Sequence, residues 1–212
     1  MKTLDVFLGT EKVEFHPFGT VFWKSKKILL IADVHLGKIG HFRKHGSAIP
    51  ADSIQKNFEK LTEIIKKYHP EKIIFLGDLF HSSLNYEWKL FEKWVEKQTA
   101  EIILIEGNHD IISPLNYQEL GIKTQKELIL NKFLLTHHPE ERKGYFTICG
   151  HLHPGFKLAG RGKQVLKLRC FYKTENQLVL PAFGEFTGNY WVQPEPEDKI
   201  FVCTPTEVIA IN

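Results

Sequence analysis

Three short, continuous apolar runs lie in the first half of this sequence, and segments with helical periodicity separate them. The runs are Lys27–Asp33, Lys72–Leu76 and Glu101–Ile105. Unbroken runs of this kind are typical of strands buried on both faces, as in parallel sheets covered by helices. Apolar residues recur every three or four positions in Ala51–His69 and Tyr86–Gln98, which predicts two amphipathic helices. The alternation of strand and helix therefore predicts an α/β architecture with parallel strand pairing.

The rest of the chain reads mainly as short strands. The predicted strands are Leu4–Leu8, Val13–Phe15, Val21–Trp23, Leu128–Leu130, Phe133–Thr136, Phe146–Cys149, Val165–Tyr172, Leu178–Pro181, Lys199–Cys203 and Glu207–Ile211. Asn131-Lys132 has the spacing of a hairpin turn, and Ser113-Pro114 predicts the start of a short helix. Because no linker or repeat divides the sequence, we expect residues 1–212 to form a single domain of two packed sheets with helices outside.

Composition narrows the possible functions. The 212 residues carry a net charge of +3, which is too weak to indicate nucleic-acid binding by itself. The longest apolar runs fall far short of the roughly 20 residues of a membrane span, and the N-terminus lacks the pattern of a signal peptide. Cys149, Cys170 and Cys203 form neither a disulfide framework nor a cysteine zinc site, which favours a reducing, cytoplasmic compartment. The feature that needs an explanation is the presence of 11 histidines.

Many of these histidines fall in clusters of metal-ligand residue types that directly follow a predicted strand. The clusters are Asp33-Val34-His35, Gly77-Asp78, Gly107-Asn108-His109-Asp110, His137-His138-Pro139 and Gly150-His151-Leu152-His153. In an extended segment, residues two apart point to the same side, so each Asp-x-His or His-x-His pair can face one ion. Ligands of open α/β sheets bind outside the carboxyl ends of the strands, which is where these clusters lie. The pattern therefore predicts one metal site at that edge.

The number of ligands points to two ions. Seven side chains offer O or N donors: Asp33, His35, Asp78, Asn108, His137, His151 and His153. One divalent ion with open positions needs about three or four protein ligands, so seven residues with one shared carboxylate fill two sites. Mixed imidazole, carboxylate and amide ligands suit Mn, Fe or Zn better than Mg or Ca. Two such ions can activate a bridging hydroxide and clamp a phosphoryl oxygen.

Each cluster alone also has an ordinary structural interpretation. Gly77-Asp78 could be a turn, Asn108 could occupy a left-handed turn position, and Asp110 could be a helix N-cap ahead of Ile111. Gly150-His151-Leu152-His153 could be a surface loop. The occurrence of all five clusters in this order, each at a strand end, favours the metal site.

The five clusters together resemble the signature of the calcineurin-like metallophosphoesterase superfamily, over about residues 28–155. The resemblance implies a four-layer αββα sandwich of two mixed sheets flanked by helices, with a dinuclear metal centre at its rim. It implies that Asp33, His35 and His153 hold one ion, that Asn108, His137 and His151 hold the other, and that Asp78 bridges them. It also implies that His109 assists the leaving group and that Asp110 orients His109.

Those roles agree with the chemistry of phosphoester hydrolysis. A hydroxide between two cations is a nucleophile at neutral pH, and an imidazole that titrates near neutrality can protonate the leaving oxygen. An Asp partner would set the tautomer of His109 and raise its basicity. Of the adjacent His137 and His138, we choose His137 as the ligand because it directly follows the strand, and we expect His138 to support the site or to contact substrate.

A narrower resemblance extends over about residues 28–190. The segments that carry it are Leu36-Gly37-Lys38, His41-Phe42-Arg43-Lys44 with Pro50, Gly77-Asp78-Leu79-Phe80-His81-Ser82, Asn85-x-Glu87-Trp88 and Leu180-Pro181-Ala182-Phe183-Gly184-x-Phe186-Thr187-Gly188. They are similar to the ligase-associated DNA-damage-response endonucleases, which implies DNA as substrate and DNA-repair proteins as partners. Among the ions that suit the mixed ligands, we expect Mn²⁺, with Fe and Zn as alternatives. Arg43 and Lys44 follow the first ligand cluster and are candidates for contacts with substrate phosphates.

Two other functions remain open at this point. The enzyme could hydrolyse a small phosphodiester such as a cyclic nucleotide, although the sequence contains no long inserted cap that would enclose a small ligand. The chain could also be a noncatalytic scaffold with the same fold. A scaffold would be expected to have lost some ligands or the leaving-group histidine, whereas this sequence keeps all seven candidates and His109.

Overall fold

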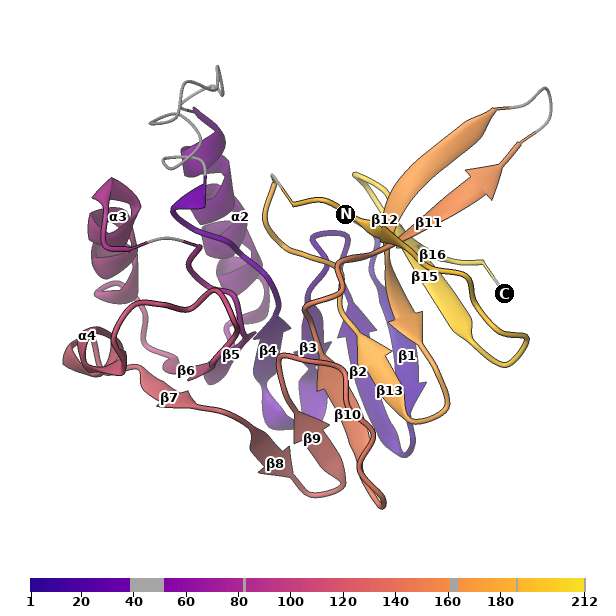
Figure 1. Cartoon of the computed structure of the whole chain (residues 1–212), viewed down its shortest axis with the longest axis horizontal. Coiled ribbons are helices and arrows are strands. Elements are labelled where there is room, and N and C mark those ends of the chain that lie inside the picture. Colours follow the sequence, from indigo (N-terminus) through magenta and orange to yellow (C-terminus); the bar gives the residue numbers. More distant parts are fainter. Residues whose placement is uncertain (39–51, 82, 161–163, 186, 212) are drawn as a thin grey trace.

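The computed structural model describes residues 1–38, 52–81, 83–160, 164–185 and 187–211. Two mixed β-sheets pack against each other, and α-helices cover the outer face of the first sheet (Figure 1). The α/β class with two mixed sheets, predicted from the strand and helix patterns, is confirmed. Within the described ranges, no helix is long and apolar enough to cross a membrane.

The first sheet has seven strands in the order β1-β2-β3-β4-β5-β6-β7. Its strands are β1 Leu4–Leu8, β2 Glu11–Phe15, β3 Val21–Trp23, β4 Ile28–Ile31, β5 Lys72–Leu76, β6 Glu101–Ile105 and β7 Lys123–Gln125. The helices that connect its parallel part are α2 Asp52–Tyr68, α3 Tyr86–Val95 and α4 Pro114–Glu119. Strands β1 to β4 are antiparallel neighbours, whereas β4, β5, β6 and β7 run parallel.

The second sheet follows the order β14-β11-β12-β13-β10-β9-β8, with β15 and β16 added through β12. Its strands are β8 Leu128–Leu130, β9 Phe133–Leu135, β10 Phe146–Cys149, β11 Pro154–Ala159, β12 Val165–Lys173, β13 Gln177–Val179, β14 Tyr190–Trp191, β15 Lys199–Cys203 and β16 Val208–Ala210. Strands β9, β10 and β13 are parallel. The carboxyl ends of β9 and β10 lie at the same edge of the molecule as the carboxyl ends of β4 and β5.

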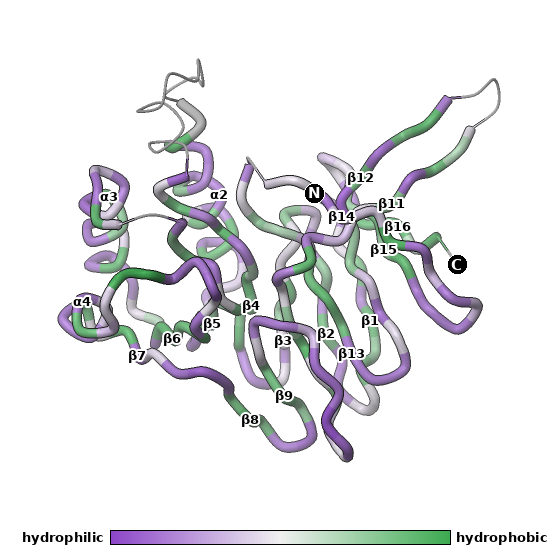
Figure 2. Tube along the Cα trace, in the orientation of Figure 1, coloured by the Kyte–Doolittle hydropathy of each residue, from purple (hydrophilic) through white to green (hydrophobic). Residues whose placement is uncertain are grey.

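Alternation along each strand divides its side chains between two cores. In β4, Leu29 and Ile31 pack against the helices, whereas Ile28 and Leu30 pack between the two sheets. The apolar segments are therefore concentrated along the strands, and polar residues occupy the turns (Figure 2). This explains why the strands of the first half read as unbroken apolar runs.

The outer face of the second sheet carries a small apolar cluster of its own. All α-helices of the described residues end before residue 120 and connect strands of the first sheet. On β12 and β15, alternate residues such as Cys170 and Ile200 face outward and form a small third cluster with Val192. Chain segments rather than a helix thus cover this part of the sheet where the structure describes it.

The predicted elements agree with the observed ones, with boundary shifts of a few residues. Asn131 adopts the left-handed conformation (φ 57°) in the β8–β9 hairpin, and the Ser113 side chain caps α4. Three strands were not predicted: β7, β11 and β14. They are short or contain Pro and Gly, so their apolar pattern is weak.

Candidate metal centre

The predicted ligands lie on loops at the carboxyl edge of the two sheets, and the backbone there is unusual. Asp33, His35, Asp78, His151 and His153 adopt left-handed conformations with φ between 50° and 69°. Residues other than glycine rarely adopt this conformation, which costs about 1–3 kcal/mol each unless the surrounding structure enforces it. Such strained positions cluster at functional sites, and here they turn five side chains toward one point.

Glycines allow the loops of the two sheets to approach each other closely. A Cβ on Gly77 would collide with the His137 ring, and one on Gly107 would collide with the Asp78 carboxylate. A Cβ on Gly150 would lie 2.5 Å from the Asp33 carboxylate. The glycines in the clusters are therefore required because each faces a candidate ligand from another strand.

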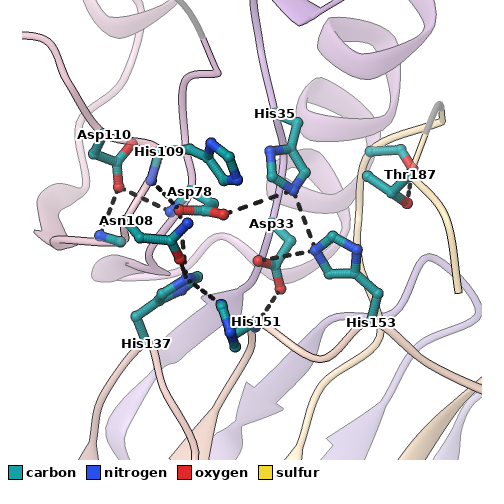
Figure 3. Close-up of polar contacts among 12 residues, drawn as sticks. Asp33, His35, Asp78, Asn108, His109, Asp110, His137, His151, His153 and Thr187 are labelled. Atoms are coloured by element: carbon teal, nitrogen blue, oxygen red, sulfur yellow. Dashed lines mark hydrogen bonds and ion pairs between the residues drawn. The ribbon is translucent and has the colours of Figure 1, made fainter. Parts of the chain in front are cut away.

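One group of candidate ligands consists of Asp33, His35 and His153. The ligand atoms of these three side chains all lie within 4.8 Å of one another. The Nε2 atoms of His35 and His153 are 3.2 Å apart, and His153 Nε2 is 3.3 Å from Asp33 Oδ1 (Figure 3). The other oxygen of Asp33 accepts a hydrogen bond from the backbone N–H of His151 at 2.9 Å. This carboxylate therefore connects the two ligand loops of different sheets.

The second group is centred on His137. Its Nε2 atom is 3.1 Å from Asn108 Oδ1 and 3.1 Å from His151 Nδ1. Asp78 lies between the groups: its Oδ1 is 3.4 Å from His137 Nε2, and its Oδ2 is 3.8 Å from His35 Nε2. All seven side chains proposed as ligands from the sequence thus converge at one place (Figure 3).

The hydrogen bonds of the imidazoles fit bound cations. His137 Nδ1 is 2.9 Å from the carbonyl of Leu76, and His153 Nδ1 is 3.2 Å from the carbonyl of Gly188. Because a carbonyl only accepts, both Nδ1 atoms are assigned as protonated, and both Nε2 atoms present a lone pair. His153 Nε2 then faces Asp33 Oδ1, a buried oxygen with no hydrogen-bond partner among the described residues. Two lone pairs facing each other are stabilised by a cation between them, as in the carbonyl-oriented histidines of metal sites.

Burial holds two of the candidate histidine ligands neutral, as metal ligation requires. Burial lowers the pKa of His35 to about 2 and that of His137 to about 4. Burial favours the neutral form of His153, but the negative charge of the Asp33 carboxylate beside Nε2 outweighs burial, and the pKa of His153 is raised. An ion at this position would replace that proton.

Asp110 makes a different set of contacts from the one predicted. Its Oδ2 accepts hydrogen bonds from the backbone N–H groups of Asp78 and Gly107, both at 2.8 Å, and its Oδ1 accepts one from Phe80 at 3.0 Å. In the part of the chain that the structure describes, it forms no hydrogen bond with the His109 ring. Burial raises its pKa to about 7. The carboxylate therefore holds together the two loops that carry Asp78 and Asn108.

The surroundings of His109 include His81, which the sequence placed near the motifs, as a residue that could line the cleft, but to which it assigned no catalytic or ligand role. The half-buried His109 ring lies 4.3 Å, centroid to centroid, from the His81 ring. The His81 ring in turn lies 5.3 Å from that of His35. The sequence signal that His81 lies near the site was its position three residues after Asp78. Strand-like pairing of this segment with Leu36 brings it back to the centre.

The three predicted substrate contacts have different outcomes. His138 is exposed, and its ring lies 4.1 Å from that of His151, so it borders the second ligand group. Its donor atom also lies within 4.8 Å of those of His137 and His151. Arg43 and Lys44 lie outside the described residues.

Two sheets with a cluster of Asp, His and Asn at their common edge form an α/β protein with a candidate metal centre. The profile of calcineurin-like phosphoesterases matches residues 26–208, and the chain therefore belongs to this family. The crystal structure of a Pseudomonas putida nuclease, MPE, superposes with a TM-score of 0.85 and 26% sequence identity, covering 99% of this chain and 100% of that one. A phosphoesterase from E. coli, Yfce, aligns less well, with a TM-score of 0.42 and 14% identity over 84% of this chain and 88% of that one. No curated protein matches the sequence significantly.

Proposed function

We propose that this protein is a nuclease that hydrolyses phosphodiester bonds of DNA with two divalent ions. The observation that carries the proposal is the position of Asp78, whose two oxygens face His137 and His35 in the two ligand groups. A carboxylate shared in this way suits two ions held side by side. When bound, the ions would lower the pKa of water and neutralise charge on the phosphoryl oxygens. The mixed O and N donors favour Mn²⁺, with Fe and Zn as alternatives.

The side chains around the ions supply orientation and a proton. Leu76 and Gly188 carbonyls fix the rings of His137 and His153, so their lone pairs stay directed inward. The backbone N–H of His109 donates to Asp78 Oδ1 at 2.9 Å, which places the His109 ring beside the same carboxylate. We assign to His109 the donation of a proton to the leaving oxygen, and to Asp110 the bracing of its loop.

The assignment of DNA as substrate is supported by similarity to a nuclease over the full chain. The sequence segments shared with DNA-damage-response endonucleases support the same substrate. The proposal extends to a role in DNA repair beside other repair proteins, in the cytoplasm, by one domain of residues 1–212. Phosphate contacts by Arg43, Lys44 and His138 also belong to it.

The test is hydrolysis by the metal-free protein reloaded with Mn²⁺, Fe²⁺ or Zn²⁺. The substrates are single-stranded DNA, nicked duplex, a cyclic nucleotide and bis-p-nitrophenyl phosphate, and the matched control is Asp78→Ala. We expect cleavage of DNA and of the nitrophenyl diester, both lost in the control. Hydrolysis of the cyclic nucleotide and the nitrophenyl diester alone would replace DNA with a small substrate. No hydrolysis with any ion would indicate a noncatalytic protein.

A further inference from the structure

Two lysines of like charge face each other on a projecting part of the molecule. Strands β11 and β12 form an antiparallel arm that extends beyond the sheets, and Lys157 is directly opposite Lys167 on it (Figure 1). Both side chains are exposed. Like charges directly opposite each other on a sheet destabilise it, and a cross-strand carboxylate at either position would have been stabilising. In the described part of the chain, neither ammonium group forms an ion pair. The two lysines are therefore candidates for binding a negatively charged partner.

An aromatic side chain holds the two ammonium groups on the same face of the arm. Lys157 Nζ is 5.4 Å and Lys167 Nζ is 5.7 Å from the centroid of the Trp191 ring. Trp191 can lie against the arm because Gly155 has no side chain: a Cβ there would be 2.9 Å from the ring. Cation–π attraction thus gathers both charges into a defined position rather than leaving them dispersed in solvent.

This cationic face lies on a strand that directly follows a candidate ligand of the metal centre. The arm begins at Pro154, directly after the candidate ligand His153. A cavity of about 450 Å³ runs from Lys167 and Arg169 to Thr187 and Asn189. Between these last two residues lies Gly188, whose carbonyl contacts the His153 ring. Thr187 is beside the ligand cluster in Figure 3.

The other charged side chains of this cavity already have partners within the protein. Lys60 is paired with Glu185 at 2.9 Å, and the Arg169 guanidinium donates to the carbonyls of Pro17 and Ala182. Lys167, together with Lys157 beyond the rim, remains available for a ligand.

We infer that the β11–β12 arm is a binding surface for the nucleic-acid strand that leaves the metal centre, with Lys157 and Lys167 contacting its phosphates. This inference rests on the proposed function. Lys157 is four positions after His153, which is about 13 Å at the rise of a β-strand. That distance corresponds to about four nucleotide steps at the 3.4 Å spacing of one DNA strand. The surface therefore acts only on polynucleotides and has no effect on small diesters.

The test uses the Mn²⁺-loaded full-length protein and the double substitution Lys157→Gln/Lys167→Gln. The matched control is Lys132→Gln/Lys143→Gln, which removes two exposed lysines from the end of the sheets opposite the metal centre. The substrates are bis-p-nitrophenyl phosphate, a dinucleotide and a single-stranded oligonucleotide of 20 residues, with kcat/KM measured between 50 and 200 mM salt. A Lys157→Arg/Lys167→Arg variant keeps the charge.

For the arm variant, we expect kcat/KM on the long oligonucleotide to fall by roughly tenfold or more, through KM. The slope of log kcat/KM against log salt should become shallower by about 1.4, or roughly 0.7 for each phosphate contact on a single strand. Activity on the two short substrates should stay within twofold of wild type, and the arginine variant should resemble wild type.

Three outcomes would overturn the inference. One is an unchanged KM and salt slope on the long oligonucleotide, and another is an equal loss in the far-end control. The third is an equal loss on the dinucleotide, which would mean a disturbed metal centre. If the wild type hydrolyses the nitrophenyl diester but no oligonucleotide of any length, the DNA substrate itself fails, and the charged face then belongs to another acidic partner.

Discussion

Replacing Asp110 with Asn should destabilise the metal centre, not only slow the reaction. The carboxylate accepts three backbone hydrogen bonds, from Asp78, Gly107 and Phe80. The single oxygen of Asn can keep at most the pair on Oδ2, and its NH₂ group would then face the N–H of Phe80. One hydrogen bond to a charged group is worth about 1.5–3 kcal/mol, and the unsatisfied buried N–H adds to the loss. We therefore expect the free energy of unfolding to fall by about 2–4 kcal/mol.

Urea unfolding of metal-free protein measures this effect, with His109→Ala as the control that should stay within about 0.5 kcal/mol of wild type. Metal content after reloading should also fall for Asp110→Asn, because the loops that carry Asp78 and Asn108 separate. If Asp110→Asn keeps wild-type stability and metal content but loses more than a hundredfold in activity, the bracing role is refuted. The carboxylate would then act through His109.

Four further changes test the rest of the site and one buried residue outside it. Asp78→Ala should lower the content of both metals by elemental analysis, since one carboxylate faces both ligand groups; wild-type metal content would contradict the bridge. His109→Ala should keep its metals and lose more activity on diesters with poor leaving groups than on a nitrophenyl diester; equal losses would argue against proton donation. Gly77→Ala should destabilise the protein by more than about 1 kcal/mol in urea, because φ is 81° and the added Cβ meets the His137 ring; unchanged unfolding would refute this. Burial lowers the pKa of His16 to about 3, so the folded state stays neutral while the unfolded state gains a proton below pH 6.5. Between pH 6.5 and pH 5, the free energy of unfolding of the wild type should therefore fall by about 2 kcal/mol relative to that of His16→Asn, both measured in EDTA, at about 1.4 kcal/mol per pH unit. If the free energies of unfolding of the two proteins change in parallel with pH, His16 is not responsible.

The sequence alone determined the order of the elements and the residues gathered at the centre. The unbroken apolar runs at β4, β5 and β6 indicate by themselves that these strands are buried on both faces. The ligand types stand directly after those strands, and parallel strands place their carboxyl ends at one edge. The proximity of Asp33 and Asp78, which follow neighbouring parallel strands, needed no further information. It follows from strand order and from the position of each residue relative to its strand.

Only the tertiary structure decided which partner each side chain has. Asp110 bonds to backbone N–H groups of Asp78 and Phe80, about thirty residues away, and no local pattern encodes such a contact. His81 reaches the centre because its segment pairs with Leu36, which depends on the packing of two loops. The arm that carries Lys157 was missed because β11 begins with Pro and Gly and gains its pairing from β12. In each case the deciding interaction joins distant parts of the chain, and such interactions exist only after the two sheets have packed.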